Sequence, residues 1–327
     1  MHWVNHINRL LSADLAAVRR HDQRHRAQLH ELTTRIEATR QRADRLQSCA
    51  REAATLPRQR TRCAGPHPAY AGTMFSNADL PLYYEWHGEA RADRRPLLLI
   101  HGGGSTIESN WGRLIPLLRD SRRLLAVELQ GHGRTGAGEG PASFERSADG
   151  VAALLAELGV GPVDVLGFSN GGQVAMQLAA RHPAAAGRLV VASAPFRRDG
   201  MIDGFWEGMA GATFEHLPQV YRDADLAVSG DPAHAERMFD LDHELMLTGF
   251  TDWPDALPAA IAAPTLVVVA DRDVVRVEHA ARLAALIPGA RLLVVPGNHG
   301  DYLGELAAAS DPGPLRRTLP FIEDFLA

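Results

Sequence analysis

The feature of this sequence that most constrains its fold is a series of short apolar runs that alternate with amphipathic segments. Four of these runs are apolar almost throughout: LLLI at 97–100, VDVLGF at 163–168, RLVVASA at 188–194 and PTLVVVAD at 264–271. Strands without a polar face are typical of parallel sheets that helices cover on both sides. The alternation therefore predicts βαβ units wound into one open α/β sheet, with functional groups at the carboxyl ends of the strands.

Three further runs extend this pattern. The segment LPLYYEWHG at 80–88 is predicted to form an edge strand, and RRLLAVELQGHGRTG at 122–136 a strand that ends in a glycine-rich loop. ARLLVVPG at 290–297 is predicted to be the last strand. Between them, SADGVAALLAELGV at 147–160 places apolar side chains along one side of a predicted helix.

The interval 195–260 breaks the alternation, because no strand is predicted in it. We expect several short helices that form a cap over a pocket, and an ordinary helical insertion packed for stability is the alternative interpretation. The α/β core then consists of residues 71–194 and 261–327. The interval is rich in large apolar side chains, which are Phe205, Trp206, Met209, Phe214, Tyr221, Met238, Phe239, Leu245, Met246, Phe250 and Trp253.

Residues 1–70 differ from the rest of the chain in charge. They contain 13 arginines and 6 acidic residues, whereas residues 71–327 contain 21 arginines and 33 acidic residues. We predict a basic helical extension and linker, because glycine and proline are absent before Pro57. A weak seven-residue spacing of apolar side chains leaves open a coiled coil that mediates self-association or a solvated helix. A third interpretation is a non-native segment, since Met74 would make a normal start for the domain.

Cysteine content and apolar run lengths exclude several classes of protein. The only two cysteines are Cys49 and Cys63, so neither a disulfide framework nor a zinc site is expected. No apolar run approaches the ~18–20 residues of a membrane span, and the N-terminus lacks a secretory signal pattern. We therefore expect a cytoplasmic protein with no metal, no other cofactor, and no membrane or nucleic-acid partner.

The segment GFSNG at 167–171 joins an apolar run to a predicted helix. A G-x-S-x-G pattern between a strand and a helix is typical of a serine nucleophile held on a sharp turn. The glycines would remove side chains that clash there, although glycines around one serine also fit a tight turn without chemistry. We predict that Ser169 is the nucleophile.

A serine hydroxyl needs a base before it can act as a nucleophile. Six histidines follow Ser169, and among them only His299 lies in a loop directly after an apolar run, in VVPGNHGDY. His299 is therefore the predicted base. Its carboxylate partner is predicted to come from PTLVVVADRDVV, where Asp273 lies further into the loop than Asp271 and can reach the imidazole.

Backbone N–H groups are predicted to complete the site as an oxyanion hole. One donor should be Asn170, directly after the nucleophile, and the other should lie in the loop HGGG at 101–104. Glycines in this loop would let the backbone approach a substrate carbonyl closely. We assign Gly103 as the main second donor, with Gly104 as the alternative.

In these motifs and their order, the chain resembles the α/β-hydrolase superfamily. The resemblance covers residues from about 75 to the end and implies an eight-stranded, mostly parallel sheet flanked by helices. It also implies a helical cap inserted after the sixth strand. The matching segments are HGGG at 101–104, GHGRT at 131–135, GFSNGG at 167–172, ADRDVV at 270–275 and PGNHGDYLGE at 296–305.

The resemblance supports Asp273 as the acid and implies structural roles for His101 and His132. The chain departs from the family pattern at Ala270, where the family loop usually has glycine. Haloalkane dehalogenases and soluble epoxide hydrolases of this fold use aspartate as the nucleophile, so Ser169 disfavours both.

We therefore expect a cofactor-independent serine hydrolase that cleaves a carboxylic ester, or a similar acyl bond, in a small molecule. The mechanism would pass through an acyl-enzyme. Hydrolysis of a carbon–carbon bond in a dienoic keto acid, lactone hydrolysis and perhydrolysis are alternatives on the same fold. A non-catalytic ligand receptor is the alternative outside enzymes.

Overall fold

The computed structural model describes residues 72–75, 80–307 and 311–327, so the extension predicted at 1–70 lies outside the described residues. The described part contains a sheet of eight strands in the order β1-β2-β4-β3-β5-β6-β7-β8. These strands are β1 (Thr73–Phe75), β2 (Leu82–His87), β3 (Leu97–Ile100), β4 (Leu124–Glu128), β5 (Val163–Phe168), β6 (Ala186–Ala192), β7 (Thr265–Arg272) and β8 (Arg291–Asn298).

The sheet is parallel from β4 across to β8, and only β2 runs antiparallel to its two neighbours. The predicted eight-stranded, mostly parallel sheet is thus confirmed. The prediction of an edge strand at 80–88 is wrong, because β1 pairs with β2 and forms the outer strand. A strand of three residues carries too little apolar pattern to be recognised from sequence.

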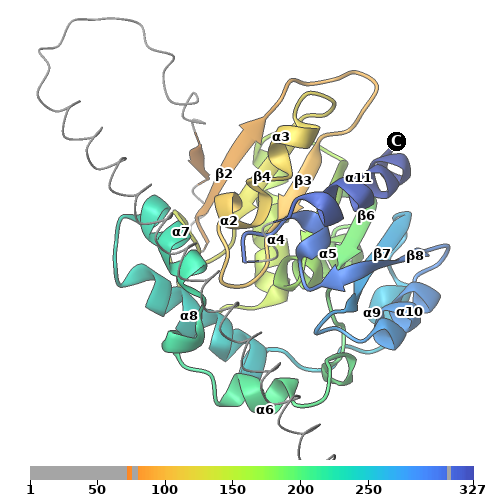
Figure 1. Ribbon diagram of the computed structural model, residues 1–327. Coiled ribbons are helices and arrows are strands. Elements are labelled where there is room, and N and C mark those ends of the chain that lie inside the picture. Colours follow the sequence, from red (N-terminus) through yellow and green to blue (C-terminus); the bar gives the residue numbers. More distant parts are fainter. Residues whose placement is uncertain (1–71, 76–79, 308–310) are drawn as a thin grey trace, which may run out of the picture. The chain divides into compact units, whose positions relative to one another are not determined.

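Helices cover both faces of the sheet. Alternate residues of each strand face opposite sides, and the side chains on both sides are apolar and need to be buried. In β3, Leu98 and Ile100 pack into one apolar core, whereas Leu97 and Leu99 pack into the other. Helices α4 (Phe144–Glu157), α5 (Asn170–Arg181) and α10 (Val277–Leu286) contribute to the first core. Helices α2 (Ile107–Trp111), α3 (Ile115–Leu118) and α11 (Gly313–Leu326) contribute to the second (Figure 1).

Residues 195–260, which we call the insertion, connect β6 to β7 through short helices and contain no strand. Figure 1 shows α6, α7 and α8 together on one side of the α/β core. None of the helices in the described ranges is long and apolar enough to cross a membrane. The helices of the insertion are η1 (Arg198–Gly200), α6 (Phe205–Ala210), η2 (Phe214–His216), α7 (Gln219–Ser229), α8 (His234–Glu244), η3 (Leu245–Gly249) and α9 (Ala256–Ala259).

Candidate active site

Ser169 occupies the turn between β5 and α5 in an unusual backbone conformation. Its φ of 53° and ψ of −122° lie outside the regions that residues with a Cβ adopt readily. A Cβ at Gly167 would lie 2.2 Å from the carbonyl oxygen of Gly171, and a Cβ at Gly171 would lie 2.1 Å from that of Ile100. The two glycines therefore let α5 begin directly against the strands, which leaves Ser169 on the turn at their carboxyl end.

The structure brings Ser169, His299 and Asp273 together, although 130 residues separate the serine from the histidine. Ser169 Oγ lies 3.2 Å from His299 Nε2, and His299 Nδ1 lies 2.7 Å from Asp273 Oδ1. His299 follows β8 and Asp273 follows β7, so adjacent strand ends supply both groups. This geometry directs the Nδ1 proton of the imidazole to the carboxylate and leaves Nε2 free to accept the serine proton.

The Asp273 carboxylate is buried and heavily hydrogen-bonded. Burial by itself would raise its pKa, but hydrogen bonds and the charge of the His299 side chain outweigh this and lower the pKa below its usual value. Ser193, directly after β6, donates to the second oxygen of Asp273, and its own Oγ lies 2.6 Å from the Tyr302 hydroxyl. The carboxylate is therefore fixed in place and remains charged at neutral pH.

Asp271, the alternative acid two residues before Asp273, makes a different contact. It lies near the end of β7 and is exposed, and its Oδ1 accepts a hydrogen bond of 2.8 Å from the Gly297 N–H. Asp271 thus joins the ends of β7 and β8, while Asp273 reaches the imidazole.

The glycine loop after β3 directs successive N–H groups to different partners. The N–H of Gly102 donates to Asn110 Oδ1 at 2.7 Å, and the N–H of Gly104 donates to Asp242 Oδ2 at 2.5 Å. Among the described residues, the N–H groups of Gly103 and Asn170 have no acceptor. The two preferred candidates for the oxyanion hole are therefore available, whereas the alternative, Gly104, is already engaged.

Asp242 is a site residue that sequence reasoning missed. It lies on α8 of the insertion, yet its Oδ2 lies 3.0 Å from His132 Nε2 and its Oδ1 lies 3.4 Å from Asn170 Nδ2. Burial by itself disfavours the charged form of each group, but their hydrogen bond and mutual attraction outweigh this cost. The pKa of Asp242 is therefore lowered and the pKa of His132 is raised. A carboxylate of the insertion therefore contacts both sides of the candidate oxyanion hole.

The two histidines that the resemblance assigned to structural roles differ. His101 is fully buried, accepts a hydrogen bond of 3.0 Å from the Leu129 N–H at Nε2, and lies 2.7 Å from the Gly102 carbonyl at Nδ1. Burial lowers its pKa to about 3, so the ring is neutral and supports the loops. His132 instead links its loop to the insertion through Asp242.

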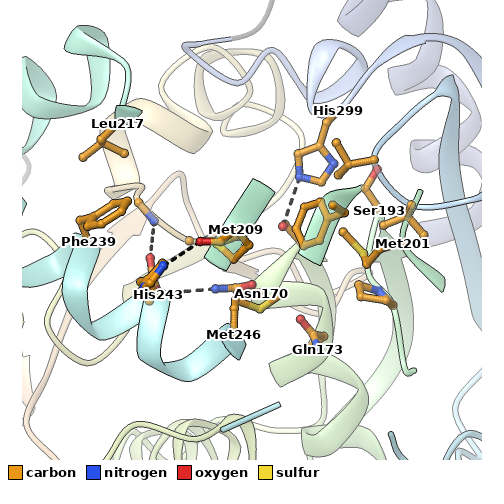
Figure 2. A pocket seen from close by; sticks show the side chains of 18 residues that line it. Asn170, Gln173, Ser193, Met201, Met209, Leu217, Phe239, His243, Met246 and His299 are labelled. Carbon is orange, nitrogen blue, oxygen red and sulfur yellow. Dashed lines mark hydrogen bonds between the residues drawn. The ribbon is translucent and has the colours of Figure 1, made fainter. Parts of the chain in front are cut away.

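A cavity opens beside Ser169 and His299. Its volume of about 300 Å³ is at the lower end of the range typical of ligand sites. Figure 2 shows His299, Ser193 and Met201 on one side of this pocket, with Leu217, Phe239 and His243 on the other. The apolar side chains of the insertion that line it are Pro195, Met201, Phe205, Met209, Leu217, Phe239 and Met246. The insertion and the core thus enclose the pocket together.

The missed residues left only weak signals in the sequence. Ser193 lies in the run VVASA, where a small residue at a strand end has no distinctive pattern. Asp242 is one of several acids on an amphipathic helix, and its partner in the glycine loop is 138 residues away. In the described ranges, no group of three or more histidine, cysteine or acidic side chains is arranged to bind a metal ion.

Comparison with known proteins places this site in a family. Residues 97–309 match the model of the alpha/beta hydrolase family. The chain belongs to the alpha/beta hydrolase family. The matched range contains every predicted site residue, from the glycine loop after β3 to His299.

Individual relatives of this alpha/beta hydrolase differ in the reactions that their names describe. It is 35% identical over 139 residues to a pimeloyl-(acyl-carrier protein) methyl ester esterase from Edwardsiella ictaluri, a match that covers 42% of this chain and 50% of the relative. It is 34% identical over 120 residues to a 2-hydroxymuconate semialdehyde hydrolase from Pseudomonas sp. strain CF600, with coverages of 34% and 41%. The chain thus spans about half or less of the length of these curated relatives.

A solved structure extends the likeness over most of the chain. Est816, described as an N-acyl homoserine lactone degrading enzyme, is 25% identical and superposes with a TM-score of 0.59. The match covers 76% of this chain and 99% of Est816. Similarity of fold thus extends well beyond the segments of highest sequence identity.

Proposed function

We propose that the chain is a cofactor-independent serine hydrolase that cleaves a carboxylic ester through an acyl-enzyme. The observation that carries this proposal is the chain of contacts from Ser169 Oγ to His299 Nε2 and from His299 Nδ1 to Asp273 Oδ1. It is supported by two N–H groups, those of Gly103 and Asn170, that have no acceptor in the described part of the chain, and by a mainly apolar cavity beside the serine. The likeness to a methyl ester esterase favours an ester over other acyl bonds.

In the first half of the reaction, Ser169 Oγ attacks the ester carbonyl while His299 Nε2 takes its proton. The carbonyl oxygen becomes an oxyanion that accepts hydrogen bonds from the N–H groups of Gly103 and Asn170. His299 then protonates the leaving alkoxide as the carbon–oxygen bond breaks. The alcohol departs and the acyl group stays on Ser169.

In the second half, water attacks the acyl-enzyme and gives a proton to His299. The second oxyanion forms against the same two N–H groups, the bond to Ser169 Oγ breaks, and the serine recovers its proton. Asp273 fixes the orientation of the imidazole and stabilises the imidazolium in both halves, without taking the proton. Lactones would follow the same steps, except that the alcohol would remain attached to the acid product.

The direct test is labelling with a fluorophosphonate, which reacts with activated serines. The wild-type protein should take up one label, and Ser169→Ala should take up none. Ser121→Ala is the matched control, because Ser121 lies in a loop before β4 and only donates to the Leu118 carbonyl; it should label like the wild type. A wild-type protein that takes no label and turns over no ester would contradict the proposal and favour a ligand receptor.

A panel of p-nitrophenyl esters with acyl chains of increasing length would then define the substrate. We expect turnover to rise with chain length until the apolar cavity is filled, because each buried methylene favours binding by about 0.8 kcal/mol. A chain-length profile that is flat from acetate onward would show that the acyl group does not enter the pocket.

A further inference from the structure

We propose that this pocket selects substrates whose acyl group is uncharged, and that Asp242 of the insertion rejects substrates that carry a carboxylate. The inference rests on the proposed function for the reaction, but it concerns the charge of the ligand and can be tested by binding alone. It names a specificity-determining residue that acts on the substrate directly.

The first observation is the set of charged groups around the cavity. Of the described residues that line it, Asp242 is the one carboxylate, His243 and His299 are the two histidines, and none is an arginine. The chain contains no lysine at all. A substrate carboxylate would therefore lose its water without gaining the guanidinium or ammonium partner that buried anions need.

The second observation is the direction of the Asp242 charge. Its side chain is 15% exposed, whereas its partner His132 is 4% exposed. His132 does not line this cavity, so the carboxylate rather than the imidazole faces the space beside Ser169. The hydrogen bond from the Gly104 N–H keeps the carboxylate against the oxyanion loop. An anionic acyl group would thus meet the carboxylate side of the Asp242–His132 pair, with the imidazole behind it, close to the reacting carbonyl.

Each histidine of the cavity already has hydrogen-bond partners of its own. His243 Nε2 lies 2.7 Å from the Met209 carbonyl, an acceptor, so this nitrogen carries a proton that is already engaged. The His243 ring stacks on Phe239. His299 contacts Ser169 and Asp273, and its role in proton transfer prevents it from serving as a permanent anion site.

Arg198 of the insertion, which contacts the backbone of the cavity residue Met246, is also engaged by other groups. Arg198 donates through Nη1 to the carbonyls of Met246 and Phe250, and its guanidinium lies 3.6 Å from the centre of the Trp206 ring. The start of α5 does attract anions, but its first N–H, at Asn170, is the proposed oxyanion donor. The pocket therefore favours neutral esters and lactones over a dienoic keto acid, which is an anion at neutral pH.

Two esters of nearly the same shape test this inference. Mono-p-nitrophenyl adipate carries a terminal carboxylate, and p-nitrophenyl 6-methylheptanoate replaces that carboxylate with an isopropyl group. We expect kcat/KM of the wild-type protein to be about 100-fold higher for the neutral ester, because like charges brought together cost several kcal/mol. Calorimetric binding of both esters to Ser169→Ala measures the same preference without turnover.

Two variants assign the preference to its cause. The ratio to compare is kcat/KM for the neutral ester divided by kcat/KM for the anionic ester. Asp242→Asn should lower this ratio by about 10-fold, because it removes the repulsion but adds no cation. Met209→Arg places a guanidinium in the same cavity and should shift the ratio toward the anionic ester even if Asp242→Asn folds poorly. Asp240→Asn is the matched control, since Asp240 is exposed on the same helix and does not line the cavity; its ratio should equal that of the wild type.

The outcomes separate the two proposals. If Ser169→Ala binds both esters equally and the wild type hydrolyses both equally, the charge inference is wrong while the proposed function stands. If the wild type hydrolyses neither ester but Ser169→Ala binds the neutral one preferentially, the charge inference stands and the proposed function is wrong. A ratio that Asp242→Asn and Met209→Arg both leave unchanged would also overturn the inference, because the preference would then have another origin.

Discussion

The two walls of the pocket are built in different ways. On the core side, the strand that leads to Ser169 is buried at all six of its residues, and parallel pairing on both sides fixes its register. On the insertion side, α6 buries no residue and α7 buries only Asp225. The core wall presents hydrogen-bonded polar groups, whereas the insertion wall presents mostly methionine and phenylalanine side chains.

This difference suggests a division of labour. A wall fixed by strand pairing can keep three polar groups within hydrogen-bond distance, which the proposed chemistry requires. A wall of flexible apolar side chains on short helices can adapt to the substrate instead. We therefore expect changes in the core wall to alter kcat by orders of magnitude, and changes in the insertion to alter substrate preference and local stability.

The largest expected effect is that of removing the proposed nucleophile. Ser169→Ala should lower kcat for a neutral ester by about a million-fold, since removal of the serine from such a triad abolishes the covalent route. Burst-phase release of p-nitrophenol should disappear with it. If Ser169→Ala kept more than a hundredth of the wild-type rate, the core wall would not be the source of catalysis.

The next largest effect separates the two acids at the carboxyl end of β7, Asp271 within the strand and Asp273 directly after it. Asp273→Asn should lower kcat by about 10⁴-fold, because the imidazole loses its partner and adopts the wrong tautomer. Asp271→Asn should stay within about three-fold of the wild type, since an exposed contact to the Gly297 N–H contributes little. Steady-state kinetics of the two variants would measure this difference. If Asp271→Asn lowered kcat more than Asp273→Asn did, the assignment of Asp273 as the partner of His299 would be wrong.

The same division explains what the sequence could reveal. Buried parallel strands are apolar on both faces, so β3, β5 and β7 were predictable from local pattern alone. Ser169 and Asp273 lie directly after β5 and β7, and His299 lies directly after β8, which made the three residues identifiable. The structure brings these three together as the pattern and the family order suggest.

The contacts of the insertion could not be predicted in this way. Asp242 becomes distinctive only when α8 meets the glycine loop after β3, a contact between segments 138 residues apart. Ser193 likewise acquires its contact to Asp273 only when β6 and β7 pair. Local patterns report burial and periodicity, and neither quantity encodes which polar side chain of an amphipathic helix will meet a distant loop.

The attachment of the insertion should depend on pH. The pKa of Asp242 is lowered from 3.8 and that of His132 is raised from 6.5. The contact between Asp242 and His132 should therefore contribute fully to the stability of the insertion between pH 3.8 and pH 6.5. It is lost as the pH falls through the lowered pKa of Asp242, and it is also lost as the pH rises through the raised pKa of His132.

Hydrogen exchange of the α8 amides would measure this contribution. Between pH 4 and 6.5, Asp242→Asn should reduce local protection by about 2 kcal/mol relative to the wild type, the usual contribution of hydrogen bonds to a charged group. The difference between the two proteins should shrink above the pKa of His132. Asp240→Asn should match the wild type throughout, and a difference that does not change with pH would show that the ion pair is not the anchor.

The smallest expected effect concerns the apolar part of the insertion wall. Phe239 lines the cavity on α8 and stacks on His243, so Phe239→Ala should raise KM for a hexanoyl ester by about five-fold, within the range for lost apolar contact in a pocket. The acetyl ester is too short to fill the cavity and should be nearly unaffected, as should kcat for both esters. Phe321→Ala is the matched control, because Phe321 is 59% exposed on α11 of the core. A fall in kcat with unchanged KM would place Phe239 with the catalytic wall and remove the distinction between the two walls at this position.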